Sequence, residues 1–426
     1  MGSARQAPEC QPVTRLSLPK EKVQILLLEG IHENAVTDLV ADGYGSIARL
    51  PGALDEDELI RRIEGVHLLG IRSRTRVTPR VLDAAQRLIA VGCFCIGTDQ
   101  VALDDARRRA IQVFNAPFSN TRSVAELVLG QIIMLMRGIF PKSVAAHRGE
   151  WVKSAANSWE VRGKTLGIVG YGNIGAQLSV LAESLGMHVI FHDTSPKLPL
   201  GRAEPCATLA QLLAQADIVS LHVPDTAATR WMIAEPQIRA MRPGSFLINA
   251  SRGRVVDVEA LATAIRDGHL LGAAADVFPD EPSSAREEFL SPLRGLPNVI
   301  LTPHIGGSTA EAQARIGNEV ARKLIDYSDV GSTFGAVNFP QVQLPARPSG
   351  TRFMHVHRNT PGLLAHVVDV FTRRDLNIGA QYLQTDGELG YVVVDVDGGA
   401  DDALEIQADL RAIAGTIRAR FLYERH

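Results

Sequence analysis

Short apolar runs alternate with amphipathic segments along most of the chain. The runs are rich in Val, Ile and Leu, which predicts buried strands; in the first third they cover residues 23–29, 67–71, 88–92 and 111–114. Segments 34–41 and 78–86 have helical spacing instead, and the second opens with Thr78 as a predicted N-cap followed by Pro79. Strands that alternate with helices predict a parallel sheet with helices on both faces.

The same alternation continues through the middle of the chain. Strands are expected at 164–169, 189–192, 217–223, 245–249, 271–275 and 299–301. Two capping-box patterns, Ser123–Glu126 and Ser308–Glu311, predict helices over 124–136 and from 308 to about 327. We interpret these helices as crossings between domains. One domain then comprises 22–118 and 308–340, and a second domain, 119–307, is inserted into it.

The C-terminal part has a different pattern. Residues 341–350 contain prolines and a glycine and are predicted to be a linker, while the polar residues 1–21 are predicted to be a disordered tail. Beyond the linker, strands and helices are expected at 351–357, 362–375, 380–385, 390–396, 401–414 and 416–423. This β-α-β-β-α-β order is ferredoxin-like. The predicted fold is therefore α/β, with two doubly wound parallel-sheet domains and a small domain at 351–426.

Composition excludes several classes of protein. The 426 residues carry a formal net charge of −3, which gives no reason to expect a nucleic-acid or membrane partner. No apolar stretch has the length of a membrane span, and the first twenty residues lack the apolar core of a secretory signal, so we expect a cytoplasmic protein. The four cysteines are too scattered for a disulfide framework, and no metal site is expected.

A glycine-rich turn follows the strand predicted at 164–169. Gly170, Gly172 and Gly175 have the spacing of the dinucleotide fingerprint, in which glycines provide a tight turn, close approach to the pyrophosphate and close helix packing. Asp193 ends the next apolar run, where a carboxylate can accept hydrogen bonds from the ribose and would repel a 2′-phosphate. The sequence therefore predicts NAD, rather than NADP, as cofactor.

Three further residues follow strands of the same domain. Arg252, Glu281 and His304 come after three consecutive predicted strands, so the fold can bring them together. Histidine can take the proton of an alcohol, a carboxylate can stabilise the imidazolium, and an arginine can hold a substrate carboxylate. Taken singly, each would be an ordinary loop residue; the set together with the NAD motif favours catalysis.

The motifs that carry these residues resemble those of the D-isomer-specific 2-hydroxyacid dehydrogenases. The resemblance lies in segments 170–175, 249–253, 276–282 and 302–307, and segments 94–98 and 115–123 are more narrowly similar to the bacterial members that act on 3-phosphoglycerate and carry a C-terminal ACT domain. It implies that His304 is the acid/base, Glu281 its partner and Arg252 the substrate-orienting group. It also implies NAD contacts from Asn173, Ile174, Asp193, Ala250, Ser251, Arg252, Asp276, His304, Ile305, Gly306 and Gly307, with Asp276 near the nicotinamide carboxamide.

The same resemblance implies a substrate and an effector. A phosphorylated substrate needs cations, and Arg72, Ser73 and Arg74, with Asn115 nearby, follow strands of the first domain; a solvated basic turn is the alternative. In the ACT domain, His357, Asn359 and Asn377 would bind L-serine across a paired interface, although these residue types are also common in turns. The segment Arg347–Gly350 departs from the paired glycines usual in this family, and a stiffer joint there would weaken the serine signal.

We therefore expect NAD-dependent oxidation of 3-phospho-D-glycerate to 3-phosphooxypyruvate, the first step of L-serine biosynthesis. Feedback by L-serine and a side reduction of 2-oxoglutarate to 2-hydroxyglutarate are implied by the resemblance. Paired ACT domains and the long apolar helix 124–136 predict at least a dimer, and we expect a homo-tetramer. Three alternatives stay open: a dehydrogenase for unphosphorylated 2-hydroxy acids, a dinucleotide-sensing interaction protein, and an amino-acid sensor with an idle dehydrogenase domain.

Overall fold

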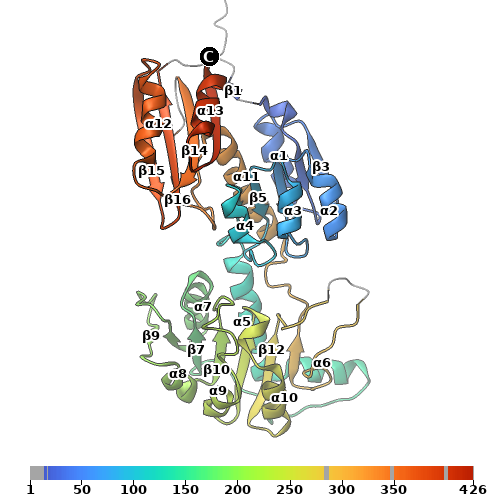
Figure 1. The fold of residues 1–426 in the computed structure, drawn as a ribbon. Coiled ribbons are helices and arrows are strands. Elements are labelled where there is room, and N and C mark those ends of the chain that lie inside the picture. Colours follow the sequence, from blue (N-terminus) through green and yellow to red (C-terminus); the bar gives the residue numbers. More distant parts are fainter. Residues whose placement is uncertain (1–13, 17, 283–286, 346–349, 398–401, 426) are drawn as a thin grey trace, which may run out of the picture. The chain divides into compact units, whose positions relative to one another are not determined.

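The protein folds into two compact units, which are described separately (Figure 1). The structure is a computed structural model and describes residues 14–16, 18–282, 287–345, 350–397 and 402–425. One unit is Phe118–Gln313, and the other combines Met1–Pro117 with Ala314–His426. By length and composition, no single helix of these described residues could cross a membrane; only the pair Thr121–Arg137 and Ile139–His147, bent by 70°, passes such a test jointly.

The unit Phe118–Gln313 contains a seven-stranded parallel sheet in the order β13-β12-β11-β10-β7-β8-β9. Its strands are β7 (Thr165–Val169), β8 (His188–His192), β9 (Glu204–Pro205), β10 (Ile218–Leu221), β11 (Ser245–Asn249), β12 (Leu270–Ala275) and β13 (Val299–Leu301). The chain runs outward from β7 to β9 and then returns to build β10 to β13 on the other side. The order in which the chain adds strands therefore reverses between β7 and β10, and ligands of such folds bind at this switch point. This confirms a doubly wound domain.

Helices cover both faces of this sheet. Its helices are α5 (Thr121–Arg137), α6 (Ile139–His147), α7 (Asn173–Ser184), α8 (Leu209–Gln215), α9 (Glu235–Ala240) and α10 (Val258–Arg266), with a 3-10 turn η2 (Gly253–Val255). Apolar side chains of α5 and α7 share one buried cluster with strand residues such as Ile168. Those of α8, α9 and α10 share another, with strand residues such as Leu247.

Both predicted capping boxes are wrong. Helix α5 already begins at Thr121, and the Ser123 hydroxyl lies inside it, 2.7 Å from the hydroxyl of Thr309. Helix α11 (Ala310–Val330) is capped one residue later than expected, because Thr309 Oγ1 accepts the Ala312 N–H at 3.2 Å. A Ser/Thr-x-x-Glu pattern marks hydroxyls near a helix start, but it does not distinguish a cap from a buried pair of hydroxyls that joins two helices.

The other unit begins with a five-stranded parallel sheet, which we call the first sheet, in the order β3-β2-β4-β5-β6. Its strands are β2 (Ile25–Leu27), β3 (Ile47–Arg49), β4 (Leu68–Ile71), β5 (Ala90–Cys93) and β6 (Gln112–Phe114), and its helices are α1 (Glu33–Ala41), α2 (Glu56–Ile63), α3 (Pro79–Ala84) and α4 (Leu103–Arg108). The predicted cap of α3 is confirmed, since Thr78 Oγ1 accepts the Val81 N–H. The order reverses between β2 and β4, so this sheet is doubly wound too.

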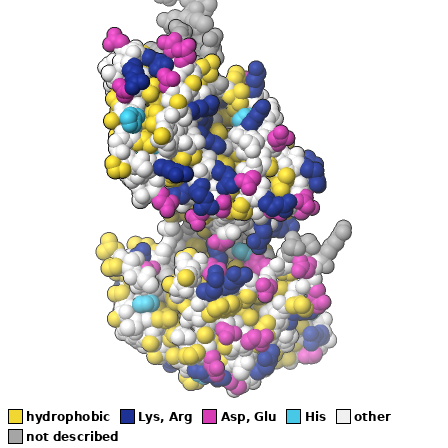
Figure 2. Space-filling model, in the orientation of Figure 1, with side chains coloured by type: hydrophobic (Ala, Val, Ile, Leu, Met, Phe, Trp, Pro, Cys, Tyr) yellow, Lys and Arg dark blue, Asp and Glu magenta, His cyan; other side chains and the backbone are white. Residues whose placement is uncertain are grey.

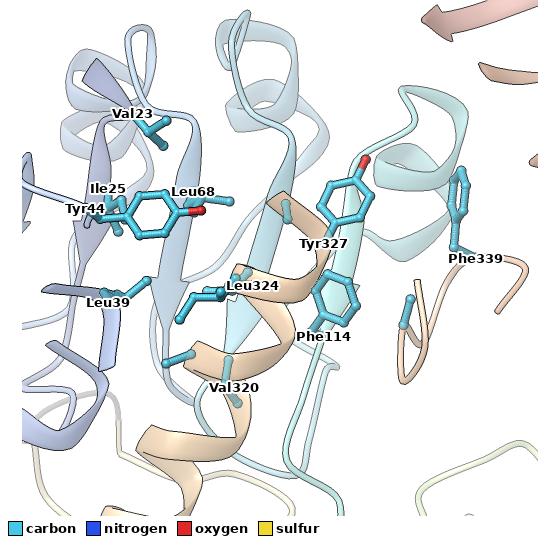
Figure 3. Close-up of a cluster of buried hydrophobic side chains, with 14 of the residues drawn as sticks. Val23, Ile25, Leu39, Tyr44, Leu68, Phe114, Val320, Leu324, Tyr327 and Phe339 are labelled. Carbon is cyan, nitrogen blue, oxygen red and sulfur yellow. The ribbon is translucent and has the colours of Figure 1, made fainter. Parts of the chain in front are cut away.

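Helix α11 packs on one face of the first sheet. Its Val320 and Leu324 lie among the side chains of Ile25, Leu68 and Phe114 in the buried cluster drawn in Figure 3. Helix α1 contributes to the same cluster, whereas α2, α3 and α4 bury their apolar residues against the opposite face. The two chain segments on either side of the inserted unit therefore share one core.

Four strands of the C-terminal residues and β1 (Thr14–Leu16) from the N-terminal segment form a five-stranded antiparallel sheet in the order β1-β17-β14-β16-β15. Its elements are β14 (Thr351–Arg358), α12 (Leu363–Thr372), β15 (Ile378–Thr385), β16 (Leu389–Val396), α13 (Ala403–Ala412) and β17 (Thr416–Arg425). The expected ferredoxin-like order is confirmed. Helices α12 and α13 cover one face, while Met354, Tyr391 and Val393 on the other face join the cluster that contains Phe339. The second face of this antiparallel sheet is therefore buried in the same hydrophobic core as the first sheet and α11.

The N-terminal segment differs from the expected disordered tail. Residues 1–13 and 17 lie outside the described part, but β1 (Thr14–Leu16) pairs with the edge strand β17, and η1 (Lys20–Lys22) follows. The Lys20 ammonium forms ion pairs with Asp42 and Asp329. An open sheet edge pairs readily with any nearby extended segment, which a purely compositional argument does not detect. Of the joint Arg347–Gly350, only Gly350 is described.

Candidate active and effector sites

The glycine turn after β7 has the geometry expected for a dinucleotide. Gly170 has φ +91°, and a Cβ there would lie 2.4 Å from the His222 carbonyl oxygen, so only glycine fits. A Cβ on Gly175 would lie 2.3 Å from the Gly170 oxygen, which shows how closely α7 approaches β7. Around Gly172, by contrast, no atom lies within 4 Å of such a Cβ. The backbone is therefore open to a phosphate at the N-terminus of α7, next to Asn173 and Ile174.

Asp193 lies beside this turn, just after β8. Its Oδ2 accepts the Tyr171 N–H at 2.9 Å, and its Oδ1 accepts the N–H and the hydroxyl of Ser195, each at 3.0 Å. Burial disfavours the charged carboxylate, but these hydrogen bonds outweigh burial and hold the pKa of Asp193 below its usual value. A fixed negative charge one strand away from the glycine turn fits the ribose of NAD and disfavours a 2′-phosphate.

The structure brings Arg252, Glu281 and His304 together, each after a different strand. His304 Nδ1 lies 2.8 Å from Glu281 Oε2, and Glu281 Oε1 accepts the Phe278 N–H at 3.1 Å. The Arg252 guanidinium donates to the Ser251 carbonyl at 2.8 Å and lies close enough to affect the pKa values of both other side chains. This is the clustering that the sequence predicted.

The charges of this cluster are coupled. The hydrogen bond to Glu281 raises the pKa of His304, and this effect outweighs burial and the repulsion from Arg252, which lower it. Burial raises the pKa of Glu281, yet the hydrogen bond and charge of His304 bring it below its ordinary value. The pair therefore favours an imidazolium next to a carboxylate, with the other imidazole nitrogen, Nε2, left for a substrate.

A buried carboxylate organises the loop that carries His304. Asp276 is 1% exposed, and it accepts hydrogen bonds from the Thr302 hydroxyl at 2.6 Å, the Ile305 N–H at 2.9 Å and the Gly306 N–H at 2.8 Å. His304 itself has φ +54°, a conformation that costs energy for a residue with a side chain. The resemblance placed Asp276 near the nicotinamide; in the structure, both of its oxygens bind this loop.

Sequence reasoning missed two positioning interactions. It gave Thr302 no role, and it did not foresee Asn249, whose Oδ1 accepts from the N–H and hydroxyl of Ser251 and whose Nδ2 donates to the Arg252 carbonyl. Gly307 is also constrained, because a Cβ there would lie 2.6 Å from the Asn120 amide nitrogen. The available signal was a polar residue at the end of each buried strand.

In the other unit, the predicted substrate residues lie at the switch point of the first sheet. Glu29, after β2, is buried and accepts the N–H groups of Arg72, Arg74 and Thr75 at 3.1, 3.0 and 2.9 Å. The loop after β4 is thereby wrapped around a carboxylate, while Ser73 and the Arg74 side chain are exposed. Glu29 was not predicted.

Asn115 is less available than expected. It lies after β6 at the same edge of the sheet, but it is 8% exposed and its Nδ2 donates to the Ile96 carbonyl at 2.6 Å. Its own carbonyl accepts from Lys323 Nζ at 2.7 Å. The residue therefore connects β6 to the loop after β5 and to α11, a positioning role.

The three predicted effector residues do not meet within one chain. His357 pairs with Gly390, which is opposite Thr385, whereas Asn377 precedes the other end of β15, where Ile378 pairs with Val396. Asn359, like His357, is at the first of these ends, and its Nδ2 donates to the Asp386 carbonyl at 2.8 Å. Burial lowers the pKa of His357, so its imidazole is held neutral.

The face of the molecule shown in Figure 2 has no large patch of a single charge. On the face shown in Figure 2, basic and acidic side chains are interspersed with hydrophobic ones over both units. This mixture agrees with the small net charge. Among the described residues, no group of three or more His, Cys, Asp or Glu side chains is arranged to hold a metal ion.

Comparisons with known proteins agree with this geometry. The profile of the D-isomer specific 2-hydroxyacid dehydrogenase NAD binding domain matches residues 129–306, and that of the AHAS small subunit-like ACT domain matches residues 353–418. The chain is 56% identical to D-3-phosphoglycerate dehydrogenase of Haemophilus influenzae over 96% of this chain and 99% of that protein. It is 54% identical to the Escherichia coli K12 protein of the same name, over 96% of this chain and all of the other.

A solved structure supports the fold and the cofactor. The D-lactate dehydrogenase of Aquifex aeolicus, complexed with NAD and lactic acid, superposes with a TM-score of 0.64 at 25% identity. The match covers 75% of this chain and all of that one.

Proposed function

Since the chain belongs to the D-isomer-specific 2-hydroxyacid dehydrogenases, an NAD-dependent enzyme family, we propose that it oxidises 3-phospho-D-glycerate to 3-phosphooxypyruvate. This reaction would be the first step of L-serine biosynthesis. The observation that carries the proposal is the contact of 2.8 Å between His304 Nδ1 and Glu281 Oε2, with Arg252 close by. The names of the two relatives cited above, both D-3-phosphoglycerate dehydrogenases, support the choice of substrate.

NAD, when bound, supplies the acceptor of the hydride that leaves the substrate carbon. His304 Nε2 takes the proton of the hydroxyl, and Glu281 stabilises the imidazolium that results. Arg252 binds the substrate carboxylate and orients the carbon that is oxidised. The loop bound to Asp276 keeps the imidazole in position throughout, because three hydrogen bonds fix it.

The substrate phosphate is assigned to the loop after β4. Its exposed Ser73 hydroxyl and Arg74 guanidinium, with Arg72, offer donors suited to a phosphate. The same donors would accept the distal carboxylate of 2-oxoglutarate, so a side reduction to 2-hydroxyglutarate belongs to this proposal. Asn115 would act indirectly, by positioning the neighbouring loop.

L-Serine is proposed as the effector of the ACT domain, bound between two copies of the chain. Strand β15 is an edge of its sheet, and pairing two such edges antiparallel would bring Asn377 of one copy next to His357 and Asn359 of the other. Pairing through this edge gives a dimer, and a homo-tetramer needs a second interface. Helix α5 buries one side in the chain's own core, but its Leu127, Leu129, Ile133 and Met134 are only partly buried, so the helix still supports that second interface.

The test is NADH formation measured with a panel of 2-hydroxy acids, with and without L-serine. We expect 3-phosphoglycerate to be preferred over lactate, and Arg74→Ala to raise KM for 3-phosphoglycerate by roughly tenfold to a hundredfold, the value of a charge-assisted hydrogen bond. The KM for lactate should change little. A wild-type chain that prefers an unphosphorylated acid would overturn the proposal.

A further inference from the structure

A basic cavity lies within the unit that contains the first sheet and the ACT domain. Its volume is about 310 Å³, and it opens between β17 and the segments that precede β4 and β5. It is lined by Leu18, Val23, His67, Gln86, Arg87, Ile89, Ser328, Gln407, Arg411, Arg418, Ala419, Arg420 and Leu422. Four of these residues are arginines and none is acidic. None of these residues was assigned to a site above.

Two of the arginines on β17 contact backbone carbonyls of the segment before β5 and of helix α11. Arg418 Nη1 donates to the Leu88 carbonyl at 2.8 Å, and Arg420 Nη2 lies 3.5 Å from the Ser328 carbonyl. The Arg420 guanidinium is stacked on the Tyr327 ring, 5.2 Å from its centroid. Its Nη1 is buried and has no hydrogen-bond partner among the described residues. A buried donor of this kind calls for an acceptor.

The described residues that line the cavity carry no negative charge. Within the described part of the chain, Arg87, Arg411, Arg418 and Arg420 form no ion pair with any carboxylate. Burial lowers the pKa of Arg418, and the charges of Arg420 and Arg411 act in the same direction. The carbonyl contacts and the neighbouring Tyr327, which acts against the lowering of the pKa of Arg418, offset this repulsion only in part. A purely structural role therefore explains the positions of Arg418 and Arg420 but not the concentration of cations.

We propose that this cavity binds a small dianion, either a phosphate group or a dicarboxylate. Guanidinium groups bind both through paired N–H donors, and Arg420 Nη1 would gain its missing acceptor. Arg418 and Arg420 belong to the ACT domain, whereas Arg87 precedes β5 of the first sheet and Ser328 lies on α11, which packs on that sheet. An anion bound by both groups of residues stabilises the contact between the ACT domain and the domain of the first sheet. The inference does not depend on the proposed substrate.

The test is calorimetric titration of the full chain with inorganic phosphate and, separately, with succinate, at constant ionic strength set by NaCl. The variant Arg87→Gln/Arg411→Gln removes two exposed arginines of the cavity and spares Arg418 and Arg420, which are partly buried and contact backbone carbonyls. Arg61→Gln/Arg373→Gln is the matched control, because these arginines are also exposed, one near the first sheet and one in the ACT domain.

We expect at least tenfold weaker binding in the cavity variant and unchanged binding in the control. To exclude binding elsewhere, amide hydrogen exchange should slow in β17 and in residues 86–89 when the anion is added to wild type, but not when it is added to the cavity variant. Tighter binding of phosphate or of succinate identifies the source of the dianion. Binding equal in wild type and cavity variant, or no protection of β17, would overturn the proposal.

Discussion

Two buried carboxylates, one in each unit, bind backbone groups of a neighbouring loop in the same way, although the two loops present different functional groups. Glu29 follows β2 and accepts three backbone N–H groups from the loop after β4. Asp276 follows β12 and accepts two N–H groups and a hydroxyl from the loop after β13. In both sheets the two strands involved are hydrogen-bonded neighbours, so the carboxylate and the loop meet at the carboxyl edge.

The difference lies in what each loop presents. The loop held by Glu29 exposes guanidinium groups, whose positive charge does not change near neutral pH, whereas the loop held by Asp276 presents an imidazole that titrates there. Asp276 itself contributes to raising the pKa of His304, after the hydrogen bond and charge of Glu281. A buried carboxylate that binds a neighbouring loop therefore positions a permanent charge for binding in one unit and a group that carries protons in the other.

The largest effect is expected from His304→Ala. Removing the base should lower kcat for 3-phosphoglycerate by about 10²–10⁴-fold, the usual contribution of general acid–base catalysis. NADH binding, followed by fluorescence quenching, should weaken far less than kcat falls, because His304 is one of many expected NAD contacts and Gly170–Gly175 and Asp193 are untouched. A variant that keeps more than half of the wild-type kcat would exclude His304 as the base.

A pair of isosteric changes separates the roles of the two carboxylates. Each amide replaces an acceptor oxygen with a donor that faces N–H groups, at a cost of about 1–3 kcal/mol, equivalent to about 5- to 150-fold. Asp276→Asn should appear mainly in kcat, because it misplaces the imidazole. Glu29→Gln should appear mainly in KM for 3-phosphoglycerate, because it misplaces the phosphate-binding loop.

Steady-state kinetics of both variants checks this split, with thermal unfolding as the control for folding. Equal effects of the two variants on kcat and on KM would mean that the carboxylates stabilise their units without directing the loops.

The smallest and most specific effect concerns pH. Oxidation requires the neutral imidazole, and Glu281 raises the pKa of His304, so kcat/KM should rise with pH through a midpoint above the ordinary histidine value of about 6.5. In Glu281→Gln, His304 loses its hydrogen bond to a carboxylate. Burial and the charge of Arg252, which both lower the pKa of His304, are then no longer opposed by Glu281. The midpoint should therefore move to lower pH; a midpoint that stays or rises would contradict the assigned coupling.

Much of the site was predictable because strands and turns are encoded locally. The order of elements, the roles of Gly170 and Gly175, and the clustering of Arg252, Glu281 and His304 follow from apolar periodicity and from the rule that parallel strands share a carboxyl edge. The first capping box failed because Ser123 lies inside α5 and its hydroxyl contacts that of Thr309, and the second failed because Thr309, not Ser308, caps α11.

The sequence by itself determined the fold class, the cofactor-binding turn and the identity of the reacting side chains, since each depends on residues near one another in the chain or on a general property of α/β sheets. Only the tertiary structure decided which carboxylates hold the loops, that Asn377 lies at the far end of the sheet from His357, and that β17 brings arginines to the first sheet's side of the molecule. Those are contacts between distant segments, and they depend on packing and strand register, which no local pattern specifies.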